Sequence, residues 1–404
     1  MSLASANRTG LRLVPEVTWG TTPASPTLTE VRYTGDGVNF DIESVTSDEI
    51  RSDRMTSDLV QVSQQTGGSL DVELSFGAFD TLLEAVMFSD YGTSGTPGPG
   101  YVAGTGTDIS FTVTTDAINS VGGIFTNVVV GQWIKITGAT DPANNGYFRV
   151  TTATDANNIA CLGAGFVTEA AAATVIVTGQ RLVNGVAAKF FSLEKTFNDT
   201  TATTYQYFTG LYVNGLSLSF ETGSILSGAF DLLGRGATIT EVRVSTPTDV
   251  AAPTNDVMNS VSNLNQIEFD NVATTASILS MTLDITNNLR QQNAIGSLNA
   301  AGIGAGRMDV TGSISLYFDT KAEYVKYLNN TSFSVSFRVQ DGVGNAYVIS
   351  MPNVEYESMS NNASGLDTDV ILEGSYRALL GTVGGVPQQI SIDRLPFSIS
   401  DLAV

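Results

Sequence analysis

Apolar and polar residues alternate along most of this 404-residue chain, a pattern typical of β-strands with one buried face. The alternation is clearest at residues 68–74 and again at residues 312–318. The apolar positions are Leu70, Val72 and Leu74 in the first stretch, and Ile314, Leu316 and Phe318 in the second. The sequence therefore predicts a mainly β fold.

The two alternating stretches lie in similar surroundings, which indicates an internal duplication. A polar segment precedes each of them, at residues 47–51 and 286–290, and a helix-like segment follows each, at residues 79–88 and 321–329. The polar segments are 239 residues apart and the alternating stretches 244 residues apart. Fused duplicates commonly close a ring with half as many chains, because successive units of one chain take equivalent places in it. The repeat therefore favours assembly over catalysis.

Two long polar segments, residues 46–67 and 286–310, lack periodicity and are predicted to be loops. Loops of this length are uncommon in compact domains and are usually functional. In the first segment, Asp48, Glu49 and Asp53 stand close to Arg51 and Arg54. These charges suit salt bridges across an interface, and they suit a solvated loop equally well.

The composition changes near residue 95, where a Gly- and Pro-rich linker covers residues 92–100. Residues 96–180 then carry short strand-like runs that suggest a small sandwich or barrel. The second copy has no counterpart, so this segment is interpreted as an insertion. The predicted domains are a first unit at residues 1–95 and 181–245, an inserted β domain at 96–180, and a second unit at 246–404. Residues 1–30 and 381–404 are predicted to be extended arms.

The charge balance argues against nucleic-acid binding. The chain has 19 Lys and Arg residues against 40 Asp and Glu residues, a net charge of −21, whereas phosphate binding depends on cations. Charged residues make up only 15% of the chain, which fits a surface largely covered by neighbouring subunits. Acidity that serves only solubility is the alternative.

Candidate chemistry is sparse, and we predict no enzyme, no cofactor and no metal site. Histidine is absent, which removes the commonest general base and the usual catalytic zinc ligand. Cys161 is alone, in a run that reads as a buried strand. The sequence shows neither a secretion signal nor an apolar run that could span a bilayer, so we expect no membrane partner and synthesis in a reducing cytoplasm.

Three stretches together resemble the major tail tube protein of long-tailed, siphovirus-like bacteriophages. They are residues 15–23 (PEVTWGTTP), residues 46–54 with 67–70 and 76–85 (TSDEIRSDR, GGSL and FGAFDTLLEA), and residues 342–352 (GVGNAYVISMP). The resemblance covers most of residues 1–95 and 181–404, and the insertion lies outside it.

The resemblance implies two packed β-sheets flanked by a helix, with one sheet forming part of the wall of a hollow tube. Six such folds make a ring in this family, so a duplicated chain implies homotrimeric, pseudo-hexameric rings stacked by helical assembly. The two polar segments would hold the contacts between rings, with the terminal arms assisting. The residues implied in those contacts are Asp48, Glu49, Arg51, Asp53, Arg54, Asn288, Arg290 and Arg307. Arg51 and Arg290 are expected to occupy matched places.

The implied partners are other copies of the chain, together with tail tip or baseplate, tape-measure and tail terminator proteins. The implied location is the virion tail, after synthesis in the host bacterial cytoplasm. DNA would pass through the lumen during ejection without specific binding, because carboxylates repel phosphates. The insertion would lie outside the tube. Two other functions stay open: another phage structural protein, such as a head decoration or baseplate component, and a bacterial surface adhesin built from β-repeats.

Overall fold

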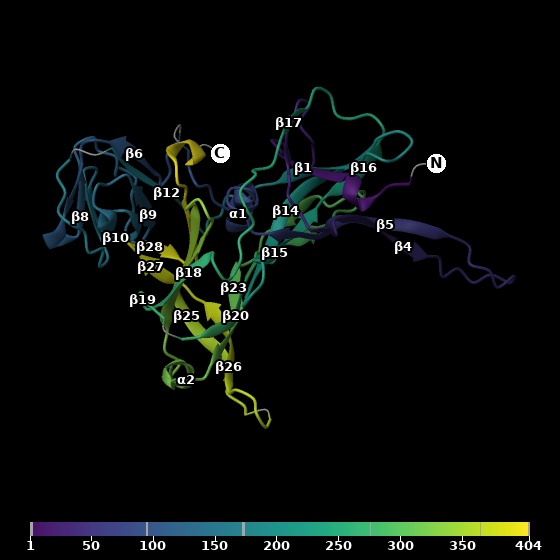
Figure 1. The fold of residues 1–404 in the computed structure, drawn as a ribbon. Coiled ribbons are helices and arrows are strands. Elements are labelled where there is room, and N and C mark those ends of the chain that lie inside the picture. Colours follow the sequence, from purple (N-terminus) through teal and green to yellow (C-terminus); the bar gives the residue numbers. More distant parts are fainter. Residues whose placement is uncertain (1–2, 94–95, 172–173, 275, 364, 403–404) are drawn as a thin grey trace.

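The computed structural model describes residues 3–93, 96–171, 174–274, 276–363 and 365–402. It is mainly β, as the alternation predicts (Figure 1). Both helix-like segments are helices, α1 (Asp80–Met87) and α2 (Ala322–Leu328). Within the described residues, no helix combines the length and the apolar character needed to cross a lipid bilayer.

The strands fall into three groups along the chain. Those before and after the insertion are β1 (Thr9–Pro15), β2 (Thr27–Glu30), β3 (Gly35–Asp36), β4 (Asn39–Thr46), β5 (Leu59–Glu73), β13 (Phe191–Phe197), β14 (Thr204–Glu221), β15 (Ser227–Gly234), β16 (Gly236–Thr240) and β17 (Thr248–Val250). Those of the insertion are β6 (Val102–Gly106), β7 (Ile109–Thr112), β8 (Ala117–Ser120), β9 (Trp133–Thr137), β10 (Gly146–Asp155), β11 (Asn158–Cys161) and β12 (Val175–Val183). The last part of the chain has β18 (Leu264–Phe269), β19 (Val272–Ala273), β20 (Ile278–Thr286), β21 (Arg290–Gln292), β22 (Gly302–Gly304), β23 (Asp309–Tyr317), β24 (Phe333–Gln340), β25 (Ala346–Ser360), β26 (Ile371–Ala378), β27 (Gly381–Val383), β28 (Val386–Gln388) and β29 (Ser391–Leu395).

The two halves of the chain share one strand order. In the first, β4 pairs with β5, β5 with β15, β15 with β14, and β14 with β13. In the second, β20 pairs with β23, β23 with β26, β26 with β25, and β25 with β24. A β-bulge interrupts the β14–β15 ladder at Asn214 and the β25–β26 ladder at Glu357, which is the same place in each half. A shared irregularity of this kind supports the duplication, because bulges are retained features of a fold.

The halves are joined edge to edge. β14 pairs with β20 from Gly215–Thr286 to Glu221–Ser280. The result is one continuous antiparallel wall of eight strands in the order β4, β5, β15, β14, β20, β23, β26, β25. Its inner residues, among them Leu70, Leu218 and Ile314, belong to one hydrophobic core that spans both halves. The alternation seen in the sequence is therefore the alternation of the two faces of this wall.

The insertion has a hydrophobic core of its own. It includes Ile118, Ile136, Cys161 and Val177, and Cys161 is buried as the sequence indicates. Residues 94 and 95 of the linker lie outside the described residues. β12 begins within the insertion, beside β6 and β9, and continues across residue 180 to pair with β29 near the end of the chain. The insertion therefore packs against the second half, where Trp133 contacts Ala346 and Leu395.

Two expectations about the ends of the chain are wrong. The segment read as an N-terminal arm contains β1, which pairs with β13 and buries Leu11 and Leu13. The segment read as a C-terminal arm contains β29, which lies between β12 and β25 and is buried at every residue from Ser391 to Leu395. Prolines near both segments favour extended structure, but burial of the apolar side chains holds both segments in the core.

The two polar segments are not long loops of matching form. Residues 59–67, expected in the first loop, belong to β5, so the turn covers residues 47–58 alone. The second segment contains the short hairpin β21–β22. Asn39 lies opposite Gly67 on β5, and Asp284 opposite Thr311 on β23, so β4 extends about five residues beyond the end of its counterpart β20. Arg51 and Arg290 therefore do not occupy equivalent places.

Candidate assembly surfaces

The face of the wall turned away from the core is polar and acidic. Serine and threonine recur along it, for example Ser217, Ser219, Thr282, Ser313 and Ser375, each on a strand whose neighbouring residues are buried. Its carboxylates include Asp41, Asp71, Glu73, Glu221, Asp231, Asp284, Asp309, Glu357 and Glu373. Against these carboxylates, the described residues of the wall strands place one cation, Arg377, on the same face. This face therefore carries a strongly negative potential.

Short polar contacts link neighbouring strands across this face. The Ser217 hydroxyl donates to the Asp284 carboxylate across the junction between the halves. Thr282 and Ser313 hydroxyls are 3.0 Å apart, and Ser358 and Ser375 hydroxyls 2.7 Å apart. These contacts tie neighbouring strands to one another on the polar face of the wall.

Each end of the wall is a strand segment that is hydrogen-bonded along one edge only. β4 forms its ladder with β5, and the last part of β25, from Glu355 to Ser360, forms its ladder with β26. Among the described residues, no strand pairs with the opposite edge of either segment. The β4 end and the β25–β26 end lie at distant ends of the molecule (Figure 1). Unpaired edges of this kind are templates for pairing with another chain.

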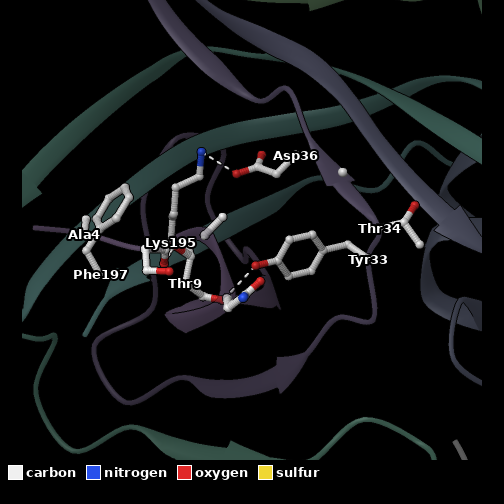
Figure 2. Close-up of a pocket in the computed structure, with 11 residues that line it drawn as sticks. Ala4, Thr9, Tyr33, Thr34, Asp36, Lys195 and Phe197 are labelled. Atoms are coloured by element: carbon white, nitrogen blue, oxygen red, sulfur yellow. Dashed lines mark hydrogen bonds and ion pairs between the residues drawn. The ribbon is translucent and has the colours of Figure 1, made fainter. Parts of the chain in front are cut away.

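A groove of about 690 Å³ lies beside the β4 end of the wall, where β3 precedes β4. Tyr33, Phe197 and Thr9 line it, with Ala4 at its rim (Figure 2). The Lys195 ammonium reaches across to the Asp36 carboxylate at 2.5 Å, and the Tyr33 hydroxyl donates to the Thr9 carbonyl at 2.7 Å. Burial, with help from the Asp36 and Glu30 carboxylates, raises the pKa of Tyr33. The Lys195–Asp36 ion pair and the Tyr33 hydrogen bond hold the side chains of this groove to one another.

The first group of sequence-predicted contact residues lies at the tip of the β4–β5 hairpin. Asp48, Glu49, Arg51, Asp53 and Arg54 are all exposed there. Arg51 donates two hydrogen bonds to Asp53, at 3.0 and 2.6 Å, which raise the pKa of Arg51 and lower the pKa of Asp53. These two charges satisfy each other inside the loop and shape its turn. The hairpin reaches far out from the body of the molecule (Figure 1).

The second group lies against the molecule. Asn288 donates to the Arg307 carbonyl at 2.8 Å and to the Asp309 carboxylate at 2.9 Å, and Arg307 pairs with Asp309 at 2.9 Å. Arg290 is exposed at the start of β21. The structure thus brings Asn288 close to Arg307 but does not bring this group to the hairpin tip.

The hairpin also exposes apolar residues, none of which is among the predicted contact residues. Ile50 is 100% exposed and Met55 66% exposed at the tip, and the strands below expose Val45, Leu59 and Val60. A protruding apolar surface is unusual on an isolated subunit and marks an interaction site. In the sequence these residues appear as isolated apolar positions within a charged, polar segment, a pattern that does not by itself predict an exposed apolar surface.

A buried network joins the two halves and the insertion. Arg394 on β29 donates to the Asp80 carboxylate of α1 at 2.7 Å and to the Gln180 side chain of β12 at 2.8 Å. The Tyr347 hydroxyl of β25 donates to Asp80 and accepts the Gly77 amide. Desolvation raises the pKa of Tyr347 well above its ordinary value. The network fixes the relative placement of elements that the wall depends on.

The sequence of the whole wall matches a known family. A family described as phage tail tube protein matches residues 6–378, which include all eight wall strands and the insertion. The chain belongs to the phage tail tube protein family. No curated protein matches the chain. The resemblance to a phage tail tube protein is thereby confirmed, and the chain is a structural protein of the virion tail.

Family membership gives the surfaces described above their context. Tail tube proteins self-assemble into a tube, so edges, grooves and protruding hairpins are places where copies can meet. Within the described residues, no group of three or more His, Cys, Asp or Glu side chains is arranged to hold a metal ion. The side chains available at these surfaces supply hydrogen bonds, ion pairs and apolar contacts.

Proposed function

We propose that this chain forms homotrimeric, pseudo-hexameric rings that stack into the hollow tail tube of a long-tailed, siphovirus-like phage. The observation that carries the proposal is the duplicated wall. Each half supplies four strands with the same order and the same bulge, and the halves join edge to edge. Three chains of eight wall strands each would close a barrel of 24 strands. Closure removes the exposed sheet edges, which are otherwise prone to aggregation.

The acidic face of the wall is proposed to line the lumen. Its carboxylates would repel DNA phosphates during ejection, and no counterions would be released to favour binding. The domain division proposed from the sequence fits this orientation, because the insertion at residues 96–180 packs through Trp133 on Ala346 and Leu395, neither of which belongs to the acidic face. It would then decorate the tube exterior. Synthesis in the host cytoplasm and contacts with tail tip or baseplate, tape-measure and terminator proteins complete the proposal.

The β4–β5 hairpin is proposed to make the main contact between stacked rings. Its apolar tip, Ile50 and Met55, would be covered by the next ring, and Asp48, Glu49 and Arg54 would form polar contacts around it. Burying an exposed apolar side chain of this size contributes about 2 kcal/mol. Asn288, Arg290 and Arg307 would contribute from the rim. We assign no enzymatic role.

Electron microscopy of purified protein tests this function. We expect the wild-type chain to form rings and hollow tubes, and the double variant Ile50→Ser, Met55→Ser to form rings that do not lengthen into tubes. Val121→Ser is the matched control, since Val121 is 86% exposed on the insertion and its loss should leave tubes unchanged. A wild-type chain that stays monomeric under all assembly conditions contradicts the tube. Normal tubes from the double variant contradict the stacking role of the hairpin.

A further inference from the structure

The junction between the two halves of one chain is a template for the junction between two chains. We infer that the open edge of β25 pairs antiparallel with β4 of a neighbouring copy, with Met359 opposite Phe40 and Ser360 opposite Asn39. The neighbour's loop after β25 then fills the groove beside Tyr33. This inference rests on the proposed ring, and it specifies the register and the occupant that the ring requires.

The register follows from equivalent positions in the two halves. On the donor side, the matched bulges make Glu357 the counterpart of Asn214, so Ser360 corresponds to Ser217. On the acceptor side, Asn39 pairs with Gly67 and Asp284 pairs with Thr311. Gly67 and Thr311 are equivalent, because they take the same place in the pairing with the next strand, β15 or β26. Asn39 therefore corresponds to Asp284. Within the chain, Ser217 lies opposite Asp284. Ser360 should therefore lie opposite Asn39 of the neighbour.

The hydrogen-bonding directions agree with this register. In the internal junction, the Asn287 amide donates to the Asn214 carbonyl at 2.7 Å, and the Thr222 amide to the Leu279 carbonyl at 3.1 Å. Ser217 and Asp284 therefore form a non-hydrogen-bonded pair. Their N–H and C=O groups point away from the junction, and their side chains lie close together. At the acceptor edge, the Gly37 amide donates to the Ser69 carbonyl of β5. Phe40 consequently directs its peptide groups toward the open edge, as the pairing with Met359 needs.

The side chains at the inferred junction are compatible. Met359 is buried on the core side of β25 and Phe40 is half-buried against the same core, so the two would extend the hydrophobic layer. Ser358 would lie opposite Asp41 on the acidic face. A serine hydroxyl beside an aspartate there repeats the contact that Ser217 makes with Asp284.

The groove beside Tyr33 has a counterpart in the second half, where the end of a strand forms one of the walls. Ile278, Leu279 and Met281 line a groove in the second half at the places that Tyr33, Thr34 and Asp36 take in the first. That second groove is about 280 Å³, and Phe220 to Gly223, at and just after the end of β14, form part of its wall. The first groove is about 690 Å³ and has no such wall within the described residues of its own chain. The missing wall corresponds to the loop after β25, where Leu366 is 91% exposed.

Lys195 protects the acceptor edge in the isolated chain. The Val38 amide donates to the Asp36 carboxylate at 3.0 Å, and the Val38 carbonyl accepts the Lys195 ammonium at 3.2 Å. Val38 corresponds to Leu283, which pairs with Leu218 in the internal junction. Pairing with Asn361 of a neighbour therefore requires these two side chains to release Val38. Lysine at a sheet edge commonly prevents premature pairing.

Cysteine cross-linking in assembled rings tests the register. In Asn39→Cys, Ser360→Cys protein, oxidation should join chains into covalent trimers, since opposed residues of such pairs are about 4.5 Å apart at Cα and within disulfide range. The control Ser217→Cys, Asp284→Cys should close a disulfide within one chain. A slipped pair, Asn39→Cys with Ser358→Cys, should cross-link at least tenfold more slowly. Burial raises the pKa of Cys161 to about 12, so that thiol does not compete.

The outcomes separate this inference from the ring itself. Rings that form normally but cross-link through the slipped pair, or not at all, overturn the register and leave the ring intact. A protein that forms no rings even without the substitutions overturns the proposed function. Leu366→Asp should weaken ring association at least tenfold, while Val121→Asp should leave it unchanged; equal association of both overturns the groove contact.

Discussion

Arg394 is predicted to be the most sensitive single position in the buried network. Replacing Arg394 with methionine keeps much of its apolar stem but leaves the Asp80 carboxylate without a cation. The side chains of Arg394 and Asp80 are 3% and 2% exposed, so water cannot replace the lost partner. Removing one member of a buried ion pair destabilises a protein by about 3–5 kcal/mol. We expect Arg394→Met to lower the free energy of unfolding by that amount.

Urea denaturation of unassembled protein measures this effect. Tryptophan fluorescence reports the relevant transition, because Trp133 packs against Leu395, the residue after Arg394. Arg307→Met is the matched control: its pair with Asp309 is 2.9 Å long but the arginine side chain is 80% exposed, so we expect a loss below about 1 kcal/mol.

A double variant sharpens the test. Adding Asp80→Leu to Arg394→Met removes the stranded charge, and we expect it to restore at least half of the lost stability, because paired apolar replacements of buried ions are well tolerated. The reasoning is refuted if Arg394→Met is no more destabilising than Arg307→Met. It is also refuted if adding Asp80→Leu to Arg394→Met lowers the free energy of unfolding further, by about 3–5 kcal/mol.

Three further predictions concern other parts of the molecule. Trp133→Ala should lower the free energy of unfolding by about 3–5 kcal/mol by opening a cavity between the insertion and the second half, and a change below about 1 kcal/mol in urea titrations argues against that packing. Burial raises the pKa of Asp393 to about 6, above the unfolded value near 3.9, so the folded state binds the extra proton and this residue's contribution to stability falls as pH rises from about 4 to 6. Asp393→Asn should remove that decline in the free energy of unfolding, which amounts to about 3 kcal/mol at most. Superimposable pH–stability profiles of the wild type and the variant would contradict this prediction. Asp71→Lys with Asp284→Lys should make tubes retain short duplex DNA at low salt and release it as salt rises; wild-type retention would contradict the repulsive lumen.

The sequence predicted the elements that have one buried face. Leu70, Val72 and Leu74 alternate because β5 packs on the core at that point, and Leu82, Val86 and Met87 fall on the buried side of α1. The repeat was visible for the same reason, since both halves bury matching faces.

Strands buried on both faces or on neither gave no such pattern. Residues 59–65 of β5 protrude from the body, so no core imposes alternation on them and they were read as a loop. β29 is buried throughout, yet it contains Asp393 and Arg394, whose partners come from distant segments. Such partners are set by tertiary structure, which local periodicity does not encode.

The candidate contact residues show the same limit. The charges at the hairpin tip were found because charged residues stand out in a polar segment, but Arg51 and Asp53 pair with each other. The edges of β4 and β25 are made of backbone groups, and their importance follows only from the order of strands in space. The matched bulges at Asn214 and Glu357 align the two halves, and in that alignment Arg51 and Arg290 do not occupy equivalent places.

The number of chains in one ring tests the central claim most directly. Cryo-electron microscopy of assembled tubes, or native mass spectrometry of released rings, counts them. Three chains of 42.5 kDa, about 128 kDa per ring, with six similar wall segments around the lumen, is the result we predict. Six chains per ring, or three chains whose two halves take dissimilar places in the wall, would contradict the account.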